Sequence, residues 1–410
     1  MQLLFCLNDM LTHFRPLFNK QSYALFVAVV KGLILSDKAT LTRFYQTSIP
    51  QSRYWSLVKF FSRSKWSASA VAIKLLTLIQ SQFDNWVYIY DETKAIKTGK
   101  KQYGLHFFRN YRYNKRNTNQ SKFHWGHQFG ALGLLCQTVS QTIFFGIWVK
   151  MIVPKSKRWN RLAVFESIVR RIRPGLIVFD RGFNNRKIFK ALLDCGHELL
   201  CRAKSNAVFY QLPTEADQPK RGRRKLYGKR VSRSRLRFAK LEFDGEEVSV
   251  ASIVGRTKMC QKLVRLVVVR RKPKKSKPYR YFCVYTTDMK LSVLKILQLY
   301  KARWGIETAF RDAKGEFGFS EYQLKSRKSI NRFVQLSFLA MALTQLVVYK
   351  VNQSPGLLEK VVTALKIHWY VPVKLTQGLI VAYLKQVLRG SSFSAFSSSE
   401  TNSAEMEAAD

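Results

Sequence analysis

The chain has 410 residues, of which 71 are Lys or Arg and 25 are Asp or Glu, so its formal net charge is 71 − 25 = +46. Apolar residues make up 47% of the chain and aromatic residues 13%, which excludes an intrinsically disordered protein and predicts two or three folded domains. So large a positive charge predicts binding to a polyanion, and nucleic acid is the usual one. The alternatives are a ribosomal type of structural protein and a protein that binds a membrane surface.

The cysteines and the hydropathy pattern indicate a cytoplasmic protein. The six cysteines include no C-x-x-C pair and lie in apolar stretches, which is typical of buried free thiols in a reducing compartment. No basic segment precedes the apolar start of the chain, so we predict no signal peptide. The most apolar segment, 333–349, is interrupted by polar side chains and is shorter than the ~20 apolar residues of a membrane helix. We expect a buried helix there and no membrane partner.

Residues 1–82 have the periodicity of helices. Apolar residues recur at spacings of three and four over 41–45, 54–61 and 71–79. Pro50 predicts a turn between the first two of these helices, because the residue before a proline avoids the helical conformation. Five basic residues accompany the helices: Arg43, Arg53, Lys59, Arg63 and Lys65. They favour a DNA-binding domain, and the alternative is a bundle that only packs on the next domain.

Strands and helices alternate over residues 83–211. Apolar runs at 87–90 and 176–179 predict buried strands, and each run is followed by an aspartate, Asp91 or Asp180. Further strands are predicted at 129–138, 142–149 and 198–210, and helices at 160–171 and 188–193. Because the apolar strands are uninterrupted, we predict an α/β sheet that is covered on both faces.

A β-rich insertion with a basic loop is predicted over residues 212–288. The loop at 220–237 is dense in Lys and Arg, and we expect Arg223, Arg224 and Lys225 to bind DNA backbone rather than to read bases. A fixed scaffold is needed for base recognition, and a solvated loop does not offer one.

The core is predicted to resume after this insertion, over residues 289–352. One long helix at 291–316 and an apolar helix at 332–349 are expected there. A helical region follows over 353–390. The Ser- and Ala-rich tail, 391–410, cannot bury enough apolar surface to fold, so we predict that it is disordered.

Asp91 and Asp180 are the first candidate catalytic residues. In an open α/β sheet, ligands bind outside the carboxyl ends of the strands, where both side chains are expected. Either aspartate alone would more often cap the turn after its strand. In a chain with so few acids, however, the pair favours a site. Glu92 is expected to face the opposite way on its strand, and Asp288 is the best alternative to Asp91.

The predicted helix at 291–316 carries polar residues along one face. At about 100° per residue, five of them fall on one stripe: Tyr300, Arg303, Glu307, Arg311 and Lys314. Trp304, Ile306 and Phe310 lie at other angles and are expected to pack against the core. The alternative is a solvated face with i, i+4 ion pairs. A largely cationic stripe around one carboxylate favours a helix that holds a phosphodiester and offers Glu307 to a metal ion.

The three carboxylates of Asp91, Asp180 and Glu307 are the predicted metal ligands. Three carboxylates that meet in an α/β fold can hold two Mg²⁺ ions, for which Mn²⁺ would substitute. One ion activates the attacking oxygen and the other stabilises the leaving oxygen, so no His or Cys nucleophile is required. His124 and His127 form an H-x2-H pair with no cysteine nearby, and we expect structural or DNA-contact histidines there rather than a zinc site.

At these residues the sequence resembles a known family. Tyr300-x2-Arg303-x3-Glu307-x6-Lys314 is the YREK signature of the DDE transposases of bacterial insertion sequences. FDRGF at 179–183 and YDETK at 90–94 are similar to the strand ends that carry the two aspartates of this family. The second aspartate and the glutamate are 307 − 180 = 127 residues apart, which leaves room for the β-rich insertion that this group carries in its RNase H-like core.

The resemblance implies an endonuclease that depends on Mg²⁺, cleaves DNA at the terminal inverted repeats of an insertion sequence and transfers the 3′-hydroxyl into target DNA. It also implies a homodimer in a paired-end complex and a bacterial, nucleoid-associated location. The residues expected to contact DNA beside the metal ions are Tyr300, Arg303, Arg311, Lys314 and Arg181. Two alternatives stay open: a non-catalytic nucleic-acid-binding remnant of an inactive element, and a metal-dependent nuclease without strand transfer.

The chain departs from the family in one respect. Members that excise through a DNA hairpin use a tryptophan in the β-rich insertion, and no tryptophan lies between Gly182 and Ala302. Tyr279, Tyr281 and Phe282 are the aromatic residues that would stack on a base instead.

Overall fold

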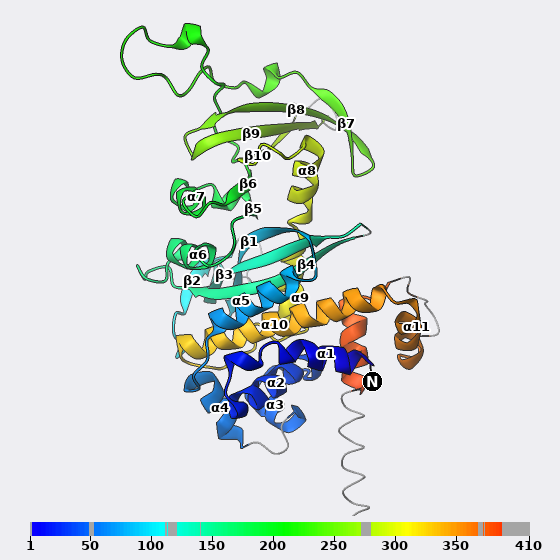
Figure 1. Cartoon of the computed structure of the whole chain (residues 1–410). Coiled ribbons are helices and arrows are strands. Elements are labelled where there is room, and N and C mark those ends of the chain that lie inside the picture. The colour runs from blue at the N-terminus through cyan, green and yellow to red at the C-terminus, as the bar shows by residue number, and fades with distance from the viewer. Residues whose placement is uncertain are drawn as a thin grey trace, which may run out of the picture.

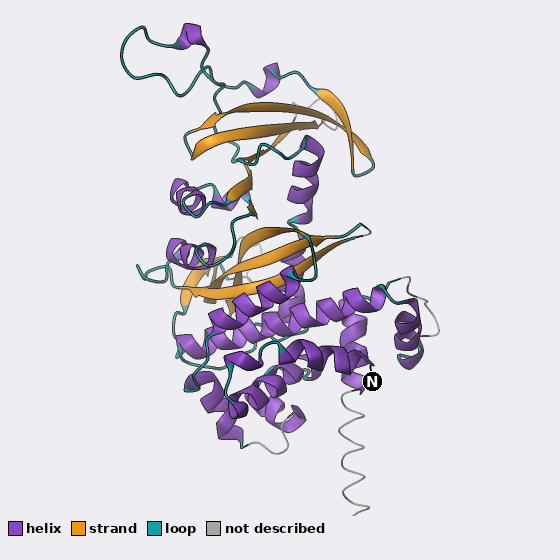
Figure 2. Cartoon of the chain, viewed as in Figure 1, coloured by secondary structure: helices purple, strands orange, loops and turns teal. Residues whose placement is uncertain are grey.

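The structure is a computed structural model that describes residues 2–48, 53–110, 113, 121–139, 141–271, 280–367, 372 and 374–387. It confirms the predicted α/β class with helices at the N-terminus (Figures 1 and 2). Three predictions lie outside the described residues: the turn at Pro50, the side chain of Tyr279 and the state of the tail after 390.

The centre of the molecule is a mixed sheet in the order β4-β3-β1-β5-β6. Its strands are β1 (Asn85–Ile96), β3 (Phe123–Gln137), β4 (Thr142–Ile152), β5 (Leu176–Phe179) and β6 (Glu198–Arg202). β3 pairs antiparallel with β1 and β4, whereas β5 pairs parallel with β1 and β6. The short edge strand β2 (His106–Arg109) pairs with the start of β3. β6 is shorter than the strand predicted at 198–210, because the polar turn after Arg202 leaves the sheet.

The β-rich insertion continues the same sheet. Its strands are β7 (Ala239–Phe243), β8 (Glu246–Thr257), β9 (Cys260–Arg271) and β10 (Arg280–Thr286), all antiparallel. β10 pairs antiparallel with β6, so the insertion and the core share one ten-stranded sheet. The basic loop before β7 projects from this end of the molecule, at the top of the view in Figure 1.

Helices cover the core sheet on both faces. α6 (Arg161–Val169) and α7 (Arg186–Leu193) begin at Asn160 and Asn185, whose side chains accept hydrogen bonds from backbone N–H groups of the first turn. The helices α8 (Val293–Ala302), α9 (Gly305–Gly315) and α10 (Arg327–Asn352) follow the insertion. The chain continues with α11 (Pro355–Ala364) and a further helical stretch at 377–387.

The helices predicted near the N-terminus are present and pack on α10. They are α1 (Gln2–Thr12), α2 (Lys20–Leu35), α3 (Leu41–Ser48), α4 (Tyr54–Ser62) and α5 (Ala68–Gln80). In Figure 1, α10 runs between the sheet and α1 to α4, whereas α5 lies beside α10 and itself contacts β4; α10 contacts β4, α2, α4 and α5. Arg43, Arg53, Arg63 and Lys65 remain exposed. The bundle therefore packs on the core and still presents basic side chains to solvent.

α10 is the one helix, within the described residues, that is long and apolar enough to cross a membrane. In its most apolar window, 83% of the residues are buried inside the protein. Gln335, which interrupts the apolar pattern, is buried and bonds to the backbone of β4, with Nε2 donating to the Ile147 carbonyl over 2.7 Å. α10 therefore has the properties of a core helix, as the sequence predicts.

Candidate active site

The register of the parallel strands brings the two candidate aspartates together. Ile89 of β1 pairs with Val178 of β5, so Asp91 and Asp180, each two residues further on, lie at the same level of the sheet. Asp180 directly follows the end of β5, as predicted, whereas Asp91 lies within β1, which continues to Ile96 beyond its pairing with β5. Each side chain then bonds to a residue at the junction of α8 and α9.

The polar stripe predicted on one long helix is wrong in its geometry, because the helix is broken. α8 ends at Ala302 and α9 begins at Gly305, with i→i−3 hydrogen bonds at the junction such as Ile306 N–H to the Arg303 carbonyl (3.1 Å). Gly305 packs so closely on β4 that an added Cβ would lie 3.0 Å from the Cβ of Phe144. The single helix predicted at 291–316 is therefore interrupted at Arg303 and Trp304, between α8 and α9.

Tyr300 and Arg303 connect the three predicted metal ligands. The Tyr300 hydroxyl donates to Asp180 Oδ1 over 3.1 Å. Arg303 donates from Nη1 to Asp91 Oδ2 over 3.2 Å and from Nη2 to Glu307 Oε1 over 2.9 Å. Only 7% of Arg303 is exposed, and its buried Nε has no hydrogen-bond partner among the described residues. Three of the four signature residues, Tyr300, Arg303 and Glu307, thus take part in contacts with each other or with the two aspartates.

Burial and neighbouring charges shift the titration of these groups. Desolvation raises the pKa of Asp91 to about 6, and Asp180 and Glu307 add to the rise, while the Glu92 N–H and Arg303 oppose it. Desolvation and Asp180 raise the pKa of Tyr300 to about 12, so the phenol is a proton donor at neutral pH. For Arg303, desolvation lowers the pKa, but the bonds to Glu307 and Asp91 outweigh it and the net shift is upward.

The donor set suits Mg²⁺ in its chemistry, although the carboxylates are not assembled around one point. Carboxylate oxygens are the ligands that Mg²⁺ prefers. Yet no three His, Cys, Asp or Glu side chains, within the part of the chain that the structure describes, are grouped closely enough to hold a metal ion. The Arg303 guanidinium lies between Asp91 and Glu307 and compensates their charge. A divalent cation would take over that compensation, with Arg303 giving up one or both contacts.

The other residues predicted to contact DNA do not lie beside the three carboxylates. Arg311 is exposed and pairs with Asp312 (3.4 Å), and Lys314 is half-buried, where desolvation lowers its pKa. Arg181 is exposed directly after Asp180. Three further residues lie exposed in the projecting loop before β7: Arg223, Arg224 and Lys225. They are available to a long ligand such as DNA but do not line the carboxylate site.

The acids and histidines set aside in the sequence analysis have structural partners. Asp288 follows β10, which runs antiparallel to β6, so it lies at the opposite edge of the sheet from Asp91 and cannot replace it.

His127 is fully buried and bonds to the Tyr103 carbonyl (2.9 Å) and the Tyr322 hydroxyl (2.8 Å). Burial lowers the pKa of His127 to about 4. His124 lies on the other face of β3, so the two do not form a zinc pair.

Sequence reasoning missed a partly buried ion pair behind the aspartates. Glu92 faces away from Asp91, as predicted, and accepts hydrogen bonds from Gln128 Nε2 (2.6 Å) and from Arg161 Nε. Arg161 also donates to the Gly182 carbonyl (3.4 Å), in the turn just after Asp180, and its guanidinium lies over the Phe183 ring. Arg161 therefore connects the middle of β1, where Asp91 lies, to the turn that follows Asp180. The acid next to Asp91 was the available signal, but its partner is 69 residues away.

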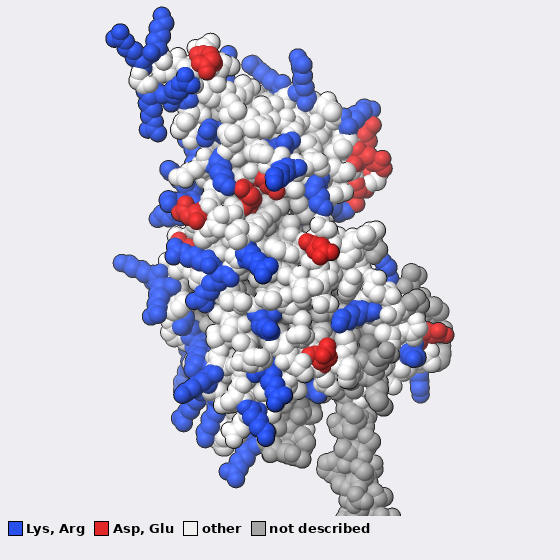
Figure 3. Space-filling model, viewed as in Figure 1, with Lys and Arg blue, Asp and Glu red and all other residues white. Residues whose placement is uncertain are grey.

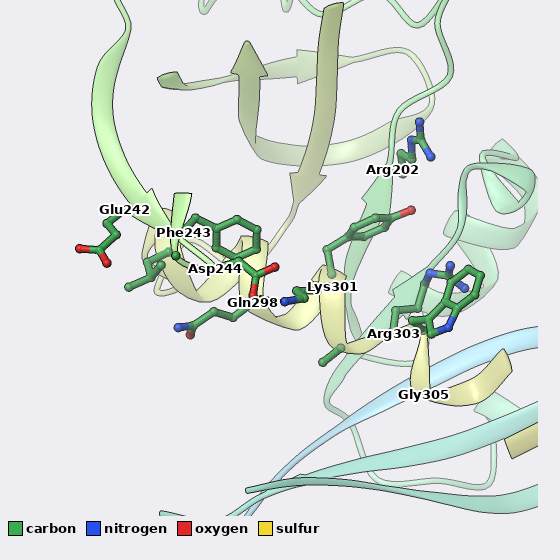
Figure 4. Close-up of a pocket in the computed structure, with 13 residues that line it drawn as sticks. Arg202, Glu242, Phe243, Asp244, Gln298, Lys301, Arg303 and Gly305 are labelled. Atoms are coloured by element: carbon green, nitrogen blue, oxygen red, sulfur yellow. Dashed lines mark ion pairs between the residues drawn. The ribbon is translucent and has the colours of Figure 1, made fainter. Parts of the chain in front are cut away.

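A cavity of about 1210 Å³ opens beside the site. It lies between the β7–β8 turn and the α8–α9 junction, and Figure 4 shows Arg303, Lys301 and Asp244 on its wall. Lys301 forms an ion pair with Asp244 across it. Trp304, which was expected to pack against the core, is 62% exposed and lines this cavity. Of the aromatic residues in the insertion, Phe282 packs against the ring of Tyr300, with centroids 5.4 Å apart.

Comparison with known proteins adds an independent finding. Residues 150–344 match the family described as "Transposase DDE domain", a range that includes Asp180 and Glu307 but not Asp91. No curated protein matches the chain. The α/β core and the matched range agree with one another, and the match shows a transposase DDE domain over this part of the chain.

Proposed function

We propose that this protein is an insertion-sequence transposase of the YREK group that cleaves DNA at the ends of its element and transfers the 3′-hydroxyl into target DNA. The observation that carries the proposal is the contact network of Arg303 and Tyr300 with Asp91, Asp180 and Glu307. A network of this kind unites acids from two strands and a helix that are far apart in the sequence.

Each residue of the network has a role in this proposal. Asp91, Asp180 and Glu307 hold two Mg²⁺ ions, or Mn²⁺ in their place. The bound ions would activate the attacking oxygen and stabilise the leaving oxygen of the phosphodiester. Arg303 leaves the carboxylates for the DNA phosphate, where its guanidinium binds two oxygens. Tyr300 orients Asp180 through the hydrogen bond that its protonated phenol donates.

The partners follow from charge and family. DNA is the partner of a transposase, and a net charge of +46 supports strong binding to its backbone. We propose that the N-terminal helices bind the terminal inverted repeats through their exposed arginines and lysines. A homodimer in a paired-end complex and a nucleoid-associated location in the bacterial cytoplasm complete the proposal.

The test is a nicking assay on a plasmid that carries the gene together with the DNA bordering it on both sides. Asp180→Asn should bind the border DNA as the parent does but lose nicking in Mg²⁺ by about a hundredfold or more, because a metal ligand is gone. Asp288→Asn is the matched control, since that acid also follows a strand but lies at the other edge of the sheet. It should nick at the parent's rate.

The outcomes separate the alternatives. Parent protein that exposes 3′-hydroxyls and joins them to a second plasmid is a transposase. Breaks without joined products identify a nuclease, and border binding without any break identifies a non-catalytic remnant. An Asp180→Asn protein that nicks like the parent overturns the assignment of the site.

A further inference from the structure

Three aromatic side chains form a strip at the outer end of the core sheet. They are Phe107 of β2 and Phe123 and Trp125 of β3, and we refer to them as the aromatic strip. Phe107 pairs with Trp125 across the two strands, and the ring centroids are 4.6 Å apart. Phe107 is 69% exposed and Phe123 is 48% exposed. Large rings this exposed, on the edge strand β2 and at the start of β3, are unusual unless they bind a partner.

The strip lies on the same face of the sheet as Asp91. Asp91 pairs with Ala131, and side chains at every second residue of a strand share a face, so Phe123 and Trp125 project on the Asp91 side. Trp125 is six residues from Ala131, which corresponds to roughly 20 Å along the strand. The Trp125 indole is held in place by its Nε1–H, which donates to the Gly99 carbonyl over 3.0 Å.

The charge around the strip indicates the partner. Residues 93–165 contain fourteen Lys or Arg and no Asp or Glu, although 25 acids in 410 residues would place four or five in such a stretch. Lys100, Lys101, Arg109 and Lys122 are all exposed close to the strip in the fold. Figure 3 shows Lys and Arg side chains crowding the flank where Figure 1 places β2 and α6, with few acids among them. A second copy of the chain would bring the same positive charge and be repelled.

We infer that the aromatic strip binds unpaired nucleotides of a DNA strand. Exposed rings stack on bases while flanking Lys and Arg hold the phosphates, which is how proteins bind single strands without reading their sequence. Duplex DNA keeps its bases stacked inside, so the rings would have little to bind there. This inference rests on DNA as the partner in the proposed function, but it does not require that the protein cleave it.

The test measures binding of the full chain to a 20-nucleotide oligo-dT by fluorescence anisotropy, without divalent metal, over a range of NaCl concentrations. Replacing both exposed rings, as Phe107→Leu/Phe123→Leu, keeps the apolar character and removes stacking. We expect an affinity loss of roughly tenfold or more, with the slope of log affinity against log salt unchanged, because no charge is removed. Phe5→Leu is the matched control, since Phe5 is 75% exposed on α1, and it should bind as the parent does.

A second pair of variants tests the phosphate contacts. Lys100→Gln/Lys101→Gln should lower the salt slope by about 1.4, because each phosphate contact to a single strand contributes about 0.7. Lys240→Gln/Lys262→Gln is its control, since both of these lysines pair with glutamates in the structure. That control should leave the slope unchanged.

Four results would overturn the inference. The first is a Leu/Leu variant that binds oligo-dT like the parent. The second is an equal loss on a duplex of the same length, which would mean that unpaired bases are not what the rings bind. The third is a Phe107→Trp/Phe123→Trp variant, which retains stacking, that binds as weakly as the Leu/Leu variant. The fourth is a change of oligomeric state in sedimentation with oligo-dT affinity intact, which would make the strip a self-association surface.

Failure of this inference and failure of the proposed function are separate results. A parent protein that never nicks the border DNA can still bind oligo-dT through the strip. Conversely, a protein that nicks normally and binds oligo-dT without the rings refutes the strip alone.

Discussion

Arg303 contacts two of the three candidate metal ligands and lies almost entirely out of solvent. Its guanidinium gives Asp91 and Glu307 a counter-charge in the absence of a metal ion, so two acids can remain close without strong repulsion. The same group is well suited to a phosphodiester. If Arg303 moves from the carboxylates to a DNA phosphate, the binding of DNA frees Asp91 and Glu307 for the metal ions.

Asp91 provides a pH test of this arrangement. Its pKa is about 6 in the folded protein and near 3.9 in the unfolded chain, so the folded state binds more protons between these values. The contribution of Asp91 to the free energy of unfolding is therefore fully present below about pH 4 and is lost as the pH rises through 6. We expect Asp91→Asn, which carries no charge, to be more stable than the parent at pH 7.5 by up to about 3 kcal/mol, and by less at pH 5.

Urea unfolding in EDTA at both pH values measures the difference. Asp194→Asn, an exposed acid paired with Lys190 at the end of α7, is the control and should show no such change with pH. If Asp91→Asn changes the free energy of unfolding by the same amount at both pH values, the raised pKa of Asp91 is wrong.

At the scale of elements, junctions between helices position the site. The bend between α8 and α9 aims Arg303 at β1, and Gly305 permits it because the backbone packs on β4. A second junction holds the N-terminal helices to the core. Arg332 of α10 is 2% exposed and donates hydrogen bonds to the carbonyls of Phe60, Phe61, Ser64 and Trp66, at and after the end of α4. Desolvation lowers the pKa of Arg332 to about 10, so the guanidinium is still charged at neutral pH. The negative ends of the carbonyl dipoles stabilise this buried charge.

Replacing Arg332 by Met should lower the free energy of unfolding by about 2–5 kcal/mol, because four carbonyls at and after the end of α4 lose a charged donor. Chemical denaturation measures the loss, with Lys328→Met on the exposed side of the same helix as the control. Protection of α4 amides from hydrogen exchange should fall more than that of β1. A neutral or stabilising Arg332→Met would mean that the buried charge costs as much as its hydrogen bonds contribute.

At the scale of the molecule, an excess of 46 positive charges is spread over the N-terminal helices, the flank near β2 and the projecting loop (Figure 3). Such self-repulsion destabilises the compact state, and it is relieved by salt or by a bound polyanion. The surface is thus suited to binding long DNA, and the protein is more stable when it is bound to DNA.

The thermal midpoint should therefore rise by several degrees between about 20 and 300 mM NaCl, since the Debye length falls below the spacing of the charges. Heparin at low salt should have the same effect, and uncharged dextran is the control. A midpoint that falls with salt would indicate that attractive surface ion pairs outweigh the repulsion.

The sequence by itself determined the fold class and indicated the DDE domain that the match over residues 150–344 shows. The apolar runs before Asp91 and Asp180 predict buried strands, and the structure has strands there that pair in parallel. The spacing from Tyr300 to Lys314 identified the signature, although the residues assigned to the metal ions remain a proposal. Local patterns suffice here because strand burial and helix periodicity are properties of neighbouring residues.

Only the tertiary structure decided where the helix bends, what Arg303 contacts and which rings stay exposed. The helical wheel assumes an unbroken helix, and the bend arises because Gly305 packs on Phe144, 161 residues away in the chain. In the same way, Arg161 reaches Glu92 and Phe107 lies against Trp125 through contacts between separate elements. Such contacts depend on how distant segments pack, and no periodicity within one segment records them.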